Sequence, residues 1–259
     1  GNLYDFNPAA DAVAPADMEI LDRWALETTA RAGRRILKAY EDYEYHVVFH
    51  TLYQLFTVDL SAVYLDVLKD RLYCSAKTSR LRRSAQTALF RILKDSLTLM
   101  APVLPFTAEE AWEAMPGFPG KPESVHLGLF PSFAEGGLDP ALFEEQEALM
   151  AVREKALKEL EKAREEKRIG NALEAALTLT APAGQWTLLK RHEASLPALF
   201  IVSAVTLKQG SGPELEVEVG RAPGAKCERC WNYSTAVGAS SAHPGVCRRC
   251  ADVLEGRAT

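Results

Sequence analysis

Four of the five cysteines in this 259-residue chain form two pairs with the spacing of a metal site. The pairs are Cys227-x2-Cys230 and Cys247-x2-Cys250, with residues 231–246 between them. Two cysteines separated by two residues can hold one ion through a tight turn, and a second pair completes the tetrahedron that zinc prefers. Because four protein ligands leave no position for water, we predict one structural Zn²⁺ with no hydrolytic role.

Other uses of these residues fit the sequence less well. Iron in a rubredoxin-like site also takes two such pairs, but Trp231 and Ala251 stand where rubredoxin-like knuckles favour glycine. A pair of disulfides would require an oxidising compartment, and His243 would serve as a ligand only in place of a thiolate. Zinc is therefore the metal that we expect.

The remaining cysteine and the other histidines do not indicate a second site. Cys74 stands alone and is expected to be a small buried hydrophobe. His46 and His50 lie one helical turn apart, but the residues between them offer no carboxylate that would act as a general base. The sequence has no recognisable spacing of nucleophile, base and orienting group, and no glycine-rich phosphate loop after a strand. We predict no catalytic residue.

Charge is distributed unevenly along the chain, whose net charge is −5. This value argues against a uniformly basic nucleic-acid binder, but binding depends on where the charge lies. Between residues 69 and 94 there is a single acid, and the basic residues are Lys69, Arg71, Lys77, Arg80, Arg82, Arg83, Arg91 and Lys94. The chain has neither an apolar run that would span a bilayer nor a signal peptide, so we expect a cytosolic protein with no membrane partner.

The elements that position these side chains are mostly helices in the first half of the chain. Apolar residues recur at helical spacing through residues 17–115, with helices predicted at 45–58, from 61 to about 69, and at 79–100. The T-x-x-E pattern of residues 107–110 predicts a capping box that opens a further helix. One face of the helix at 45–58 is expected to be buried, namely Phe49, Leu52, Tyr53 and Phe56.

The second half changes its periodicity. Residues 141–169 predict one long charged helix, which either lies on a domain or forms a weak coiled coil. Residues 173–180 and 214–219 alternate between apolar and polar side chains, as half-buried strands do. A third strand is predicted at 200–207, with a helix at 186–194 before it.

Together these patterns predict a mainly α protein with a small α+β part. We expect an antiparallel helical bundle at residues 1–138. A long helix and a small α/β junction unit would occupy residues 139–222. A four-cysteine zinc knuckle or ribbon module would form residues 223–259.

Several segments resemble the isoleucyl-tRNA synthetase family. Residues 226–231, K-C-E-R-C-W, and residues 243–250 resemble the zinc module that ends the bacterial enzymes. Residues 59–73 resemble the anticodon-binding helical domain of this family, and residues 168–175 resemble the junction that follows its long helix. Residues 101–112 are similar to a stretch shared by the leucine, valine and isoleucine enzymes, so the resemblance covers nearly the whole chain.

This resemblance implies a C-terminal portion that binds the anticodon stem and loop of isoleucine-accepting tRNA. The family's H-I-G-H and K-M-S-K-S motifs, which bind ATP, do not occur here, and the editing domain is also missing. The chain would then be a monomeric fragment that does no chemistry itself. Its partners would be tRNA and the catalytic and editing domains of the same polypeptide, which carry out ATP-dependent charging.

The resemblance also implies which side chains contact the tRNA. On the helices the candidates are Arg31, Arg34, Arg35, Lys38, Lys77, Arg80, Arg82 and Arg83. Beside the metal they are Trp231, Arg248 and Arg249. Three alternatives remain open: the helical residues form ordinary solvated faces, the arginines offset the negative sulfurs, and the tryptophan packs over the metal site instead of stacking on a base.

A different class of function also fits these observations. The bundle and the zinc module would serve as docking surfaces of a protein-interaction scaffold. Such a scaffold would bind a protein and ignore tRNA, so a gel shift with isoleucine tRNA and an unrelated tRNA separates the two hypotheses.

Overall fold

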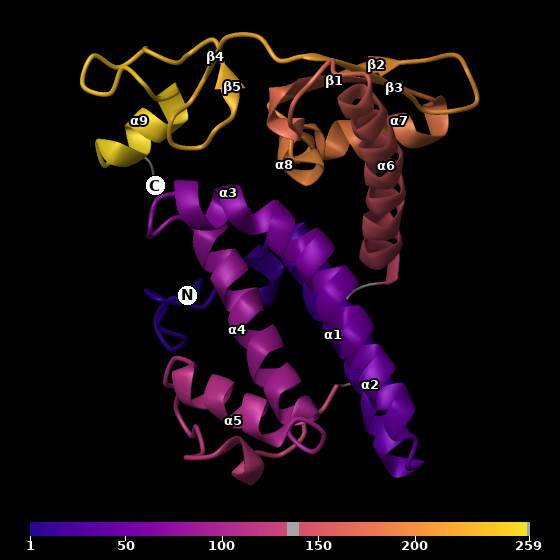
Figure 1. Cartoon of the computed structure of the whole chain (residues 1–259), viewed down its shortest axis with the longest axis vertical. Coiled ribbons are helices and arrows are strands. Elements are labelled where there is room, and N and C mark those ends of the chain that lie inside the picture. Colours follow the sequence, from indigo (N-terminus) through magenta and orange to yellow (C-terminus); the bar gives the residue numbers. More distant parts are fainter. Residues whose placement is uncertain (134–139, 258–259) are drawn as a thin grey trace. The chain divides into compact units, whose positions relative to one another are not determined.

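The computed structural model describes residues 1–133 and 140–257. Contacts between residues divide the chain into two compact units, Gly1–Phe143 and Glu144–Thr259. The first unit is built from helices, and the second combines helices with small sheets, as Figure 1 shows. The predicted mainly α fold with a small α+β part is therefore confirmed.

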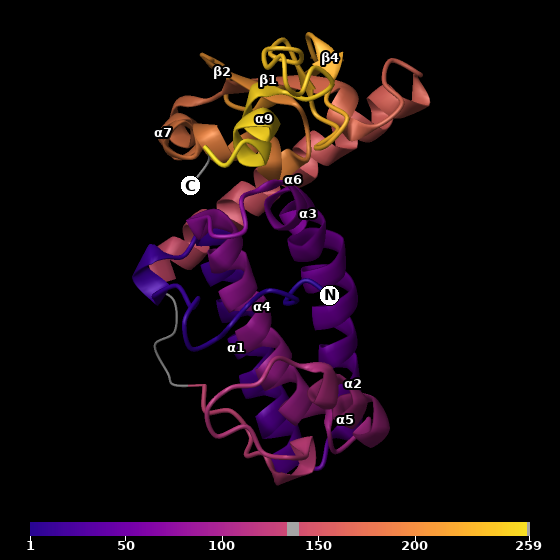
Figure 2. The ribbon, with the colours of Figure 1, turned by 90° about the vertical axis from the view of Figure 1, so that its left-hand side faces the viewer.

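Five α-helices form most of the first unit: α1 (Ile20–Glu41), α2 (Tyr45–Gln54), α3 (Asp66–Cys74), α4 (Arg80–Met100) and α5 (Pro105–Ala114). Helix α1 packs against both α2 and α4, and α4 also contacts α3 and α5 (Figures 1 and 2). Apolar side chains of α1, α2, α4 and α5 form a shared core that includes Ile36, Val48, Leu52, Leu99 and Trp112. The antiparallel bundle follows from this shared apolar interior.

A π-helical segment, Leu55–Leu65, joins α2 directly to α3, so the predicted break near residue 60 is wrong. Its buried residues are Leu55, Leu60 and Tyr64, which are separated by five and then four positions. An α-helix, with 3.6 residues per turn, would not place all three on one side. A π-helix has more residues per turn, so residues four or five positions apart lie close to the same side. The 3.6-residue period therefore misreads one continuous helix as two.

The face that α2 buries matches the prediction only in part. Leu52 is buried as predicted and Phe56 packs partly buried against the core, whereas Phe49 and Tyr53 are exposed; Val48 and Leu55 are buried instead. Two apolar stripes run along this helix, and spacing alone cannot tell which one meets α1. The stripe with the smaller aliphatic side chains packs inward.

The ends of α4 and α5 have clear causes. Ser79 is the N-cap of α4, and its side chain accepts a hydrogen bond from the backbone N–H of Arg82. Helix α5 begins at Pro105, where the fixed φ of proline suits the first helical position. The predicted capping box at residues 107–110 is therefore wrong, because these residues already lie inside the helix.

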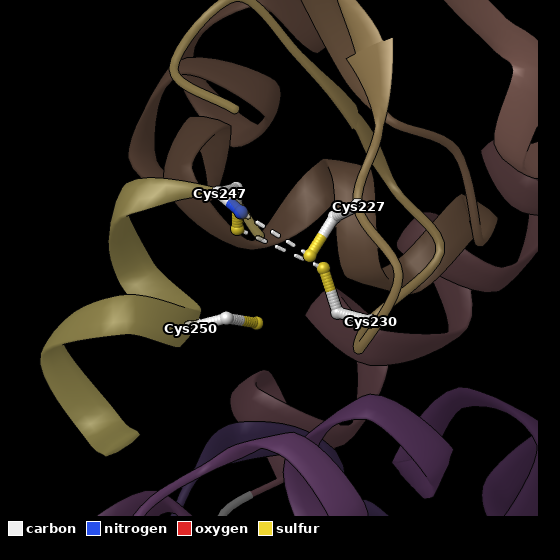
Figure 3. A group of neighbouring side chains, drawn as sticks. All are labelled: Cys227, Cys230, Cys247 and Cys250. Atoms are coloured by element: carbon white, nitrogen blue, oxygen red, sulfur yellow. Dashed lines mark hydrogen bonds between the residues drawn. The ribbon is translucent and has the colours of Figure 1, made fainter. Parts of the chain in front are cut away.

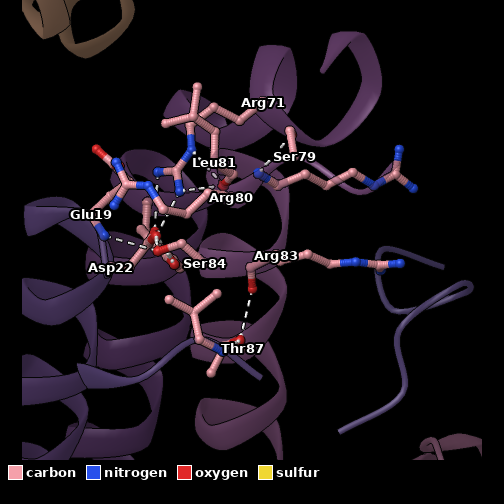
Figure 4. A network of polar contacts seen from close by, with 12 residues as sticks. Glu19, Asp22, Arg71, Ser79, Arg80, Leu81, Arg83, Ser84 and Thr87 are labelled. Atoms are coloured by element: carbon pink, nitrogen blue, oxygen red, sulfur yellow. Dashed lines mark hydrogen bonds and ion pairs between the residues drawn. The ribbon is translucent and has the colours of Figure 1, made fainter. Parts of the chain in front are cut away.

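A buried carboxylate connects three helices of the bundle (Figure 4). Asp22 of α1 accepts hydrogen bonds from the Tyr64 hydroxyl at 2.7 Å and from both terminal nitrogens of Arg71 at 2.6 and 3.1 Å. The hydroxyl of Ser84 on α4 donates to the same carboxylate. Arg71 also donates to the carbonyl of Leu81 at 2.7 Å. Tyr64 and Arg71 thus stabilise the interior of the bundle by binding Asp22, although both lie in the stretch that resembles an anticodon-binding domain.

The second unit contains a three-stranded sheet in the order β2-β1-β3. Its strands are β1 (Ala175–Ala181), β2 (Ala204–Gln209) and β3 (Glu216–Arg221). β1 pairs in parallel with β2, through Leu177 opposite Val205, and antiparallel with β3, through Leu177 opposite Val219. The parallel connection passes through α7 (Ala183–Arg191) and α8 (Leu196–Phe200).

One face of this sheet is buried and the other is open. The alternate β1 residues Ala175, Leu177, Leu179 and Ala181 are buried, and the residues between them are only partly buried. The long helix α6 (Pro140–Glu165) places Leu149, Val152, Ala156, Leu160 and Ala163 in the same core. The helix therefore lies on its own domain, and no coiled coil is needed to bury its apolar stripe.

The strand predicted at residues 200–207 begins later than expected. Phe200 ends α8, and Ile201 adopts a left-handed backbone conformation with a φ of 57°. The apolar run at this point belongs partly to the end of a helix, which periodicity does not distinguish from a buried strand.

Candidate metal centre and nucleic-acid interface

The first cysteine pair lies at the turn of a short hairpin. Strand β4 (Ala225–Lys226) pairs with β5 (Tyr233–Ser234), and Cys227 and Cys230 lie between them. The backbones approach so closely that a Cβ atom on Gly224, where φ is 90°, would lie 2.2 Å from the Ser234 carbonyl carbon. Only glycine fits this position. The hairpin therefore aims both thiols of the first pair at one point.

The second cysteine pair lies at the start of helix α9 (Arg248–Leu254). Cys247 is the N-cap residue of this helix, and Cys250 lies in its first turn. The backbone N–H of Glu228 donates to the Gly245 carbonyl at 3.0 Å, which joins the segment before α9 to the first pair. The four thiols thus come from a hairpin and a helix that local hydrogen bonds hold together.

The four sulfur atoms lie close enough to share one ion. All four Sγ atoms are within 4.8 Å of one another, and all four cysteines are buried (Figure 3). The Sγ atoms of Cys230 and Cys247 are 3.8 Å apart, and no disulfide joins the cysteines. Zinc bonded tetrahedrally to sulfur at about 2.3 Å would place sulfurs about 3.8 Å apart. The four cysteines therefore fit a zinc ion in a closed, structural site.

Local donors favour a thiolate at the first cysteine. Burial opposes a charge on Cys227, but backbone N–H groups of Cys230, Cys247 and Arg229 lower its pKa to about 6. Burial raises the pKa of Cys247 and that of Cys250, and neighbouring sulfurs add to both shifts. The Arg229 side chain contacts the Cys250 sulfur at 3.6 Å, so this arginine helps to offset the negative charge of the sulfurs.

Trp231 follows the first pair in an unusual conformation. Its backbone is left-handed, with a φ of 64°, and the residue is 61% exposed. The Lys226 ammonium lies 5.7 Å from the centre of the indole ring. The ring is therefore not packed away over the sulfurs, which was the commoner expectation for a tryptophan beside a metal ligand.

Two of the predicted phosphate contacts hold the first residues of the chain onto α4. Arg82 donates to the Asp5 carboxylate at 3.0 Å, and Arg83 donates to the Asp5 carbonyl at 2.8 Å. Arg83 also lies 3.5 Å from the Asp11 carboxylate. The side chains of Arg82 and Arg83 are only 16% and 14% exposed, so most of their surface already contacts protein.

The other helical candidates differ in their exposure and in whether they already pair with an acidic side chain. Lys77 and Arg35 are exposed. Arg80 is 61% exposed although it donates to Glu19 at 2.7 Å. Arg31 and Arg34 share the Glu27 carboxylate, at 3.1 and 3.0 Å. Lys38 pairs with Asp42 at 2.8 Å, which raises the pKa of its ammonium group.

Two arginines of the zinc module lie on the first turn of α9. Arg248 is 61% exposed and pairs with Asp252 at 3.1 Å. Arg249 is also exposed. Both side chains therefore present positive charge at the surface of the module, close to the clustered cysteines in sequence.

The exposed outer face of α2 was missed in the sequence, although a signal was present. Residues 45–58 contain no Asp, Glu, Lys or Arg, whereas a solvated helix face normally carries charge. Its aromatic side chains are exposed despite this composition.

Within the described residues, no helix has the length and apolar character needed to cross a membrane.

Comparison with known proteins gives two family matches. Residues 22–179 match the anticodon-binding domain of tRNA ligase. Residues 224–253 match a zinc finger found in FPG and IleRS, and this range includes all four clustered cysteines. The second match agrees with the zinc-like geometry of the sulfurs.

Similar curated proteins are named isoleucine–tRNA ligase. The protein from Syntrophotalea carbinolica is 48% identical over 266 residues, which cover 99% of this chain and 28% of the relative. The protein from Symbiobacterium thermophilum is 46% identical, with 98% of this chain and 29% of the relative covered. That from Moorella thermoacetica is 42% identical, with the same coverage. The chain thus spans less than a third of the length of these relatives.

The family match agrees with the structure. It covers more than half of the chain, including most of the helical bundle and the start of the second unit. The chain belongs to the family of anticodon-binding domains of tRNA ligases.

Proposed function

We propose that this chain is the C-terminal tRNA-binding portion of an isoleucine–tRNA ligase and grips the anticodon stem and loop without doing chemistry. The observation that carries this proposal is the match to an anticodon-binding domain in a chain that also holds four cysteines with zinc-site geometry. Relatives with this name align with almost all of the chain. In the full-length protein, catalytic and editing domains would use ATP to charge isoleucine-accepting tRNA.

Exposed basic side chains would position the RNA through its phosphates. The best placed are Lys77 and Arg80, before and at the start of α4, and Arg35 on α1, because their side chains are exposed. Arg31 and Arg34 retain partial access beside Glu27. Arg82 and Arg83 would act indirectly, since they hold the first residues of the chain in place. Phosphate contacts fix position and orientation, whereas bases supply the specificity.

The zinc module would add a second contact surface. One Zn²⁺ held by Cys227, Cys230, Cys247 and Cys250 would fix the fold of the hairpin and α9. Trp231, Arg248 and Arg249 would then face the RNA, because all three side chains are exposed. We further propose that the protein is a cytoplasmic monomer.

Binding of the whole chain to isoleucine-accepting tRNA, compared with an unrelated tRNA, tests this function. We expect tighter binding to the isoleucine tRNA, with an affinity that falls as salt rises. The salt slope is the slope of the logarithm of the binding constant against the logarithm of the salt concentration. In the variant with Lys77→Glu and Arg80→Glu, its magnitude should fall by about 0.7–0.9 for each lost phosphate contact. Lys158→Glu, an exposed site on α6 that also has one acidic partner, is the matched control.

The outcomes separate the two classes of function. If the chain binds neither tRNA but does bind the remaining domains of the full-length enzyme, it is an interaction scaffold, and the proposal is refuted. If Lys158→Glu lowers the salt slope as much as the double variant, the phosphate contacts lie elsewhere.

A further inference from the structure

Aromatic side chains line the outer face of α2 and the corner that leads into it. Tyr45, Phe49 and Tyr53 recur every four residues along the helix, and each is more than half exposed. The imidazoles of His46 and His50 are exposed beside them. Tyr43, at the corner between α1 and α2, is 79% exposed. We call these six side chains the aromatic strip.

The composition of α2 indicates that this strip does not simply face water. Between Tyr45 and Val58 the chain has no charged residue, so the exposed side of α2 lacks the charge that solvated helix faces carry. Contiguous exposed apolar surface in a folded domain marks an interaction site more often than an accident.

Tyr43, at the corner between α1 and α2, has a strained backbone conformation. Tyr43 has a φ of 59°, a left-handed conformation that favours glycine or asparagine after a helix. Its N–H donates to the Tyr40 carbonyl at 3.2 Å, and the N–H of Glu44 donates to Ala39 at 2.8 Å, which together close the end of α1. Glycine would make the same two bonds without strain. Because the Tyr43 ring is so exposed, it does not offset this cost by packing, and strain of this kind concentrates at functional sites.

The rings contact one another along the helix, but more than half of the surface of Phe49 and of Tyr53 stays exposed. The Phe49 and Tyr53 ring centres are 6.2 Å apart, with an interplanar angle of 28°. His50 meets Phe49 edge to face, with ring centres 5.4 Å apart. Aromatic faces of this kind accept flat π-systems by stacking, and hydroxyl and imidazole groups at their edges can form hydrogen bonds.

We infer that the aromatic strip binds unpaired bases of an RNA loop by stacking. This inference rests on the proposed function and assigns the base-binding part of that function to α2. Base stacking on aromatic side chains is a general means of holding single-stranded RNA, whereas a duplex offers mainly phosphates and 2′-hydroxyl groups.

The charges around the strip agree with bases as the ligand instead of phosphates. At the corner, Lys38 is already paired with Asp42 and Glu41, at 2.8 and 3.7 Å, and Glu44 is exposed. This local acidity opposes a phosphate at the corner but not an uncharged base. The phosphates would instead meet basic side chains elsewhere on the chain.

The test uses the full chain with an anticodon stem-loop RNA that carries 2-aminopurine in its loop. Phe49→Ala should weaken binding by about 5- to 150-fold, the range that loss of one stacked base gives. Phe49→Leu, which keeps an apolar side chain but loses the ring face, should weaken it similarly, and Phe49→Trp should retain it. Phe106→Ala removes another exposed phenyl ring, on α5, and is the matched control.

Fluorescence and a duplex competitor complete the experiment. The 2-aminopurine signal should change on binding to the wild-type chain and to Phe106→Ala, but not to Phe49→Ala. A duplex of the stem without its loop should bind the wild type and Phe49→Ala equally. If the wild type binds the stem-loop and Phe49→Ala or Phe49→Leu binds it just as tightly, the inference fails and the proposed function stands. If the wild type does not bind the stem-loop at all, both fail.

Discussion

The hydroxyl group of Ser203 accepts a hydrogen bond from the backbone N–H of Tyr233 at 2.7 Å and donates one to the Leu173 carbonyl at 2.5 Å. Ser203 lies between α8 and β2, whereas Tyr233 opens β5 beside the first cysteine pair. One hydroxyl therefore joins the hairpin that carries the first cysteine pair to the end of the three-stranded sheet.

Ser203→Ala should loosen the hairpin from the sheet. It leaves the Tyr233 N–H without this acceptor, which costs about 1–3 kcal/mol if the group stays buried and less if water replaces the hydroxyl. Hydrogen exchange at the Tyr233 amide should become faster, while exchange in the helical bundle is unchanged. Ser195→Ala is the control, because its hydroxyl donates to the nearby His192 carbonyl and not to the hairpin. Equal protection of the Tyr233 amide in wild type and Ser203→Ala would contradict this role.

Removing zinc should unfold the cysteine module and leave the bundle helical. Residues 226–254 have few apolar side chains, so they cannot bury enough surface to offset their own ordering. Structural zinc contributes an apparent 10–16 kcal/mol in finger peptides, about the scale needed. Cys227→Ser with Cys250→Ser should lower the zinc content from about one per chain to near zero. Metal analysis, limited proteolysis and circular dichroism on one preparation test this.

Two outcomes would contradict the zinc prediction. Retention of stoichiometric zinc by the double variant would refute the four-cysteine site, and loss of most helicity would refute the independence of the bundle. Cys74→Ala is the control, since this buried cysteine lies in α3 and should leave the zinc content unchanged.

Asp22→Asn should destabilise the bundle strongly. Asp22 is fully buried, and the Arg71 side chain that it binds is 11% exposed. Removing one partner of a buried ion pair costs about 3–5 kcal/mol, because the other charge is left uncompensated. Urea denaturation monitored by helicity measures the loss. Asp66→Asn breaks an exposed pair with Lys69 and should change stability by less than about 1 kcal/mol. Similar effects of the two substitutions would show that the buried carboxylate is not a structural hub.

Acid should release the first residues of the chain before it unfolds the bundle. Burial raises the pKa of Asp5, but hydrogen bonds from Gln86 and Arg82 and the charges of Arg82 and Arg83 lower it below its usual value. A carboxyl group whose pKa is lower in the folded state stabilises that state above the unfolded pKa of about 3.9, and this stabilisation disappears as pH falls through the folded pKa.

Proteolysis of residues 1–13 as a function of pH, with an acid-stable protease, tests this linkage. In the wild type, cleavage should rise steeply below about pH 4. Asp5→Asn has no carboxylate charge at any pH, so its cleavage should be high and nearly independent of pH. Parallel pH profiles in the two proteins would show that another group controls the segment.

The cluster of four thiols was predictable from sequence because the cysteines come in local pairs. Cysteine spacing within each pair already indicates a shared ion, and the fold only has to bring two such pairs together. The interior partners of the basic residues were not predictable, since Arg82 binds Asp5, 77 positions away. A basic side chain that faces RNA and one that binds a distant carboxylate look the same in a list of charges.

The helices were predicted better than their exposed faces. Ser79 and the apolar stripe after it correctly place α4, because both signals are local. On α2 two apolar stripes compete, and only the packing of α1 decides which is buried. The π-helical segment was missed for a related reason, because its buried residues follow another period.

The central place of β1 in its sheet affects the order in which the protein can fold during synthesis. β1 precedes both of its partners along the chain, so neither of its edges can pair until β2 and then β3 have been made. The helices of the bundle, in contrast, all lie in the first unit, so the bundle can form before the sheet has been made, since domains generally fold as units from the N-terminus. A chain interrupted between β2 and β3 would expose one bare edge of its central strand, which is a template for pairing with another chain.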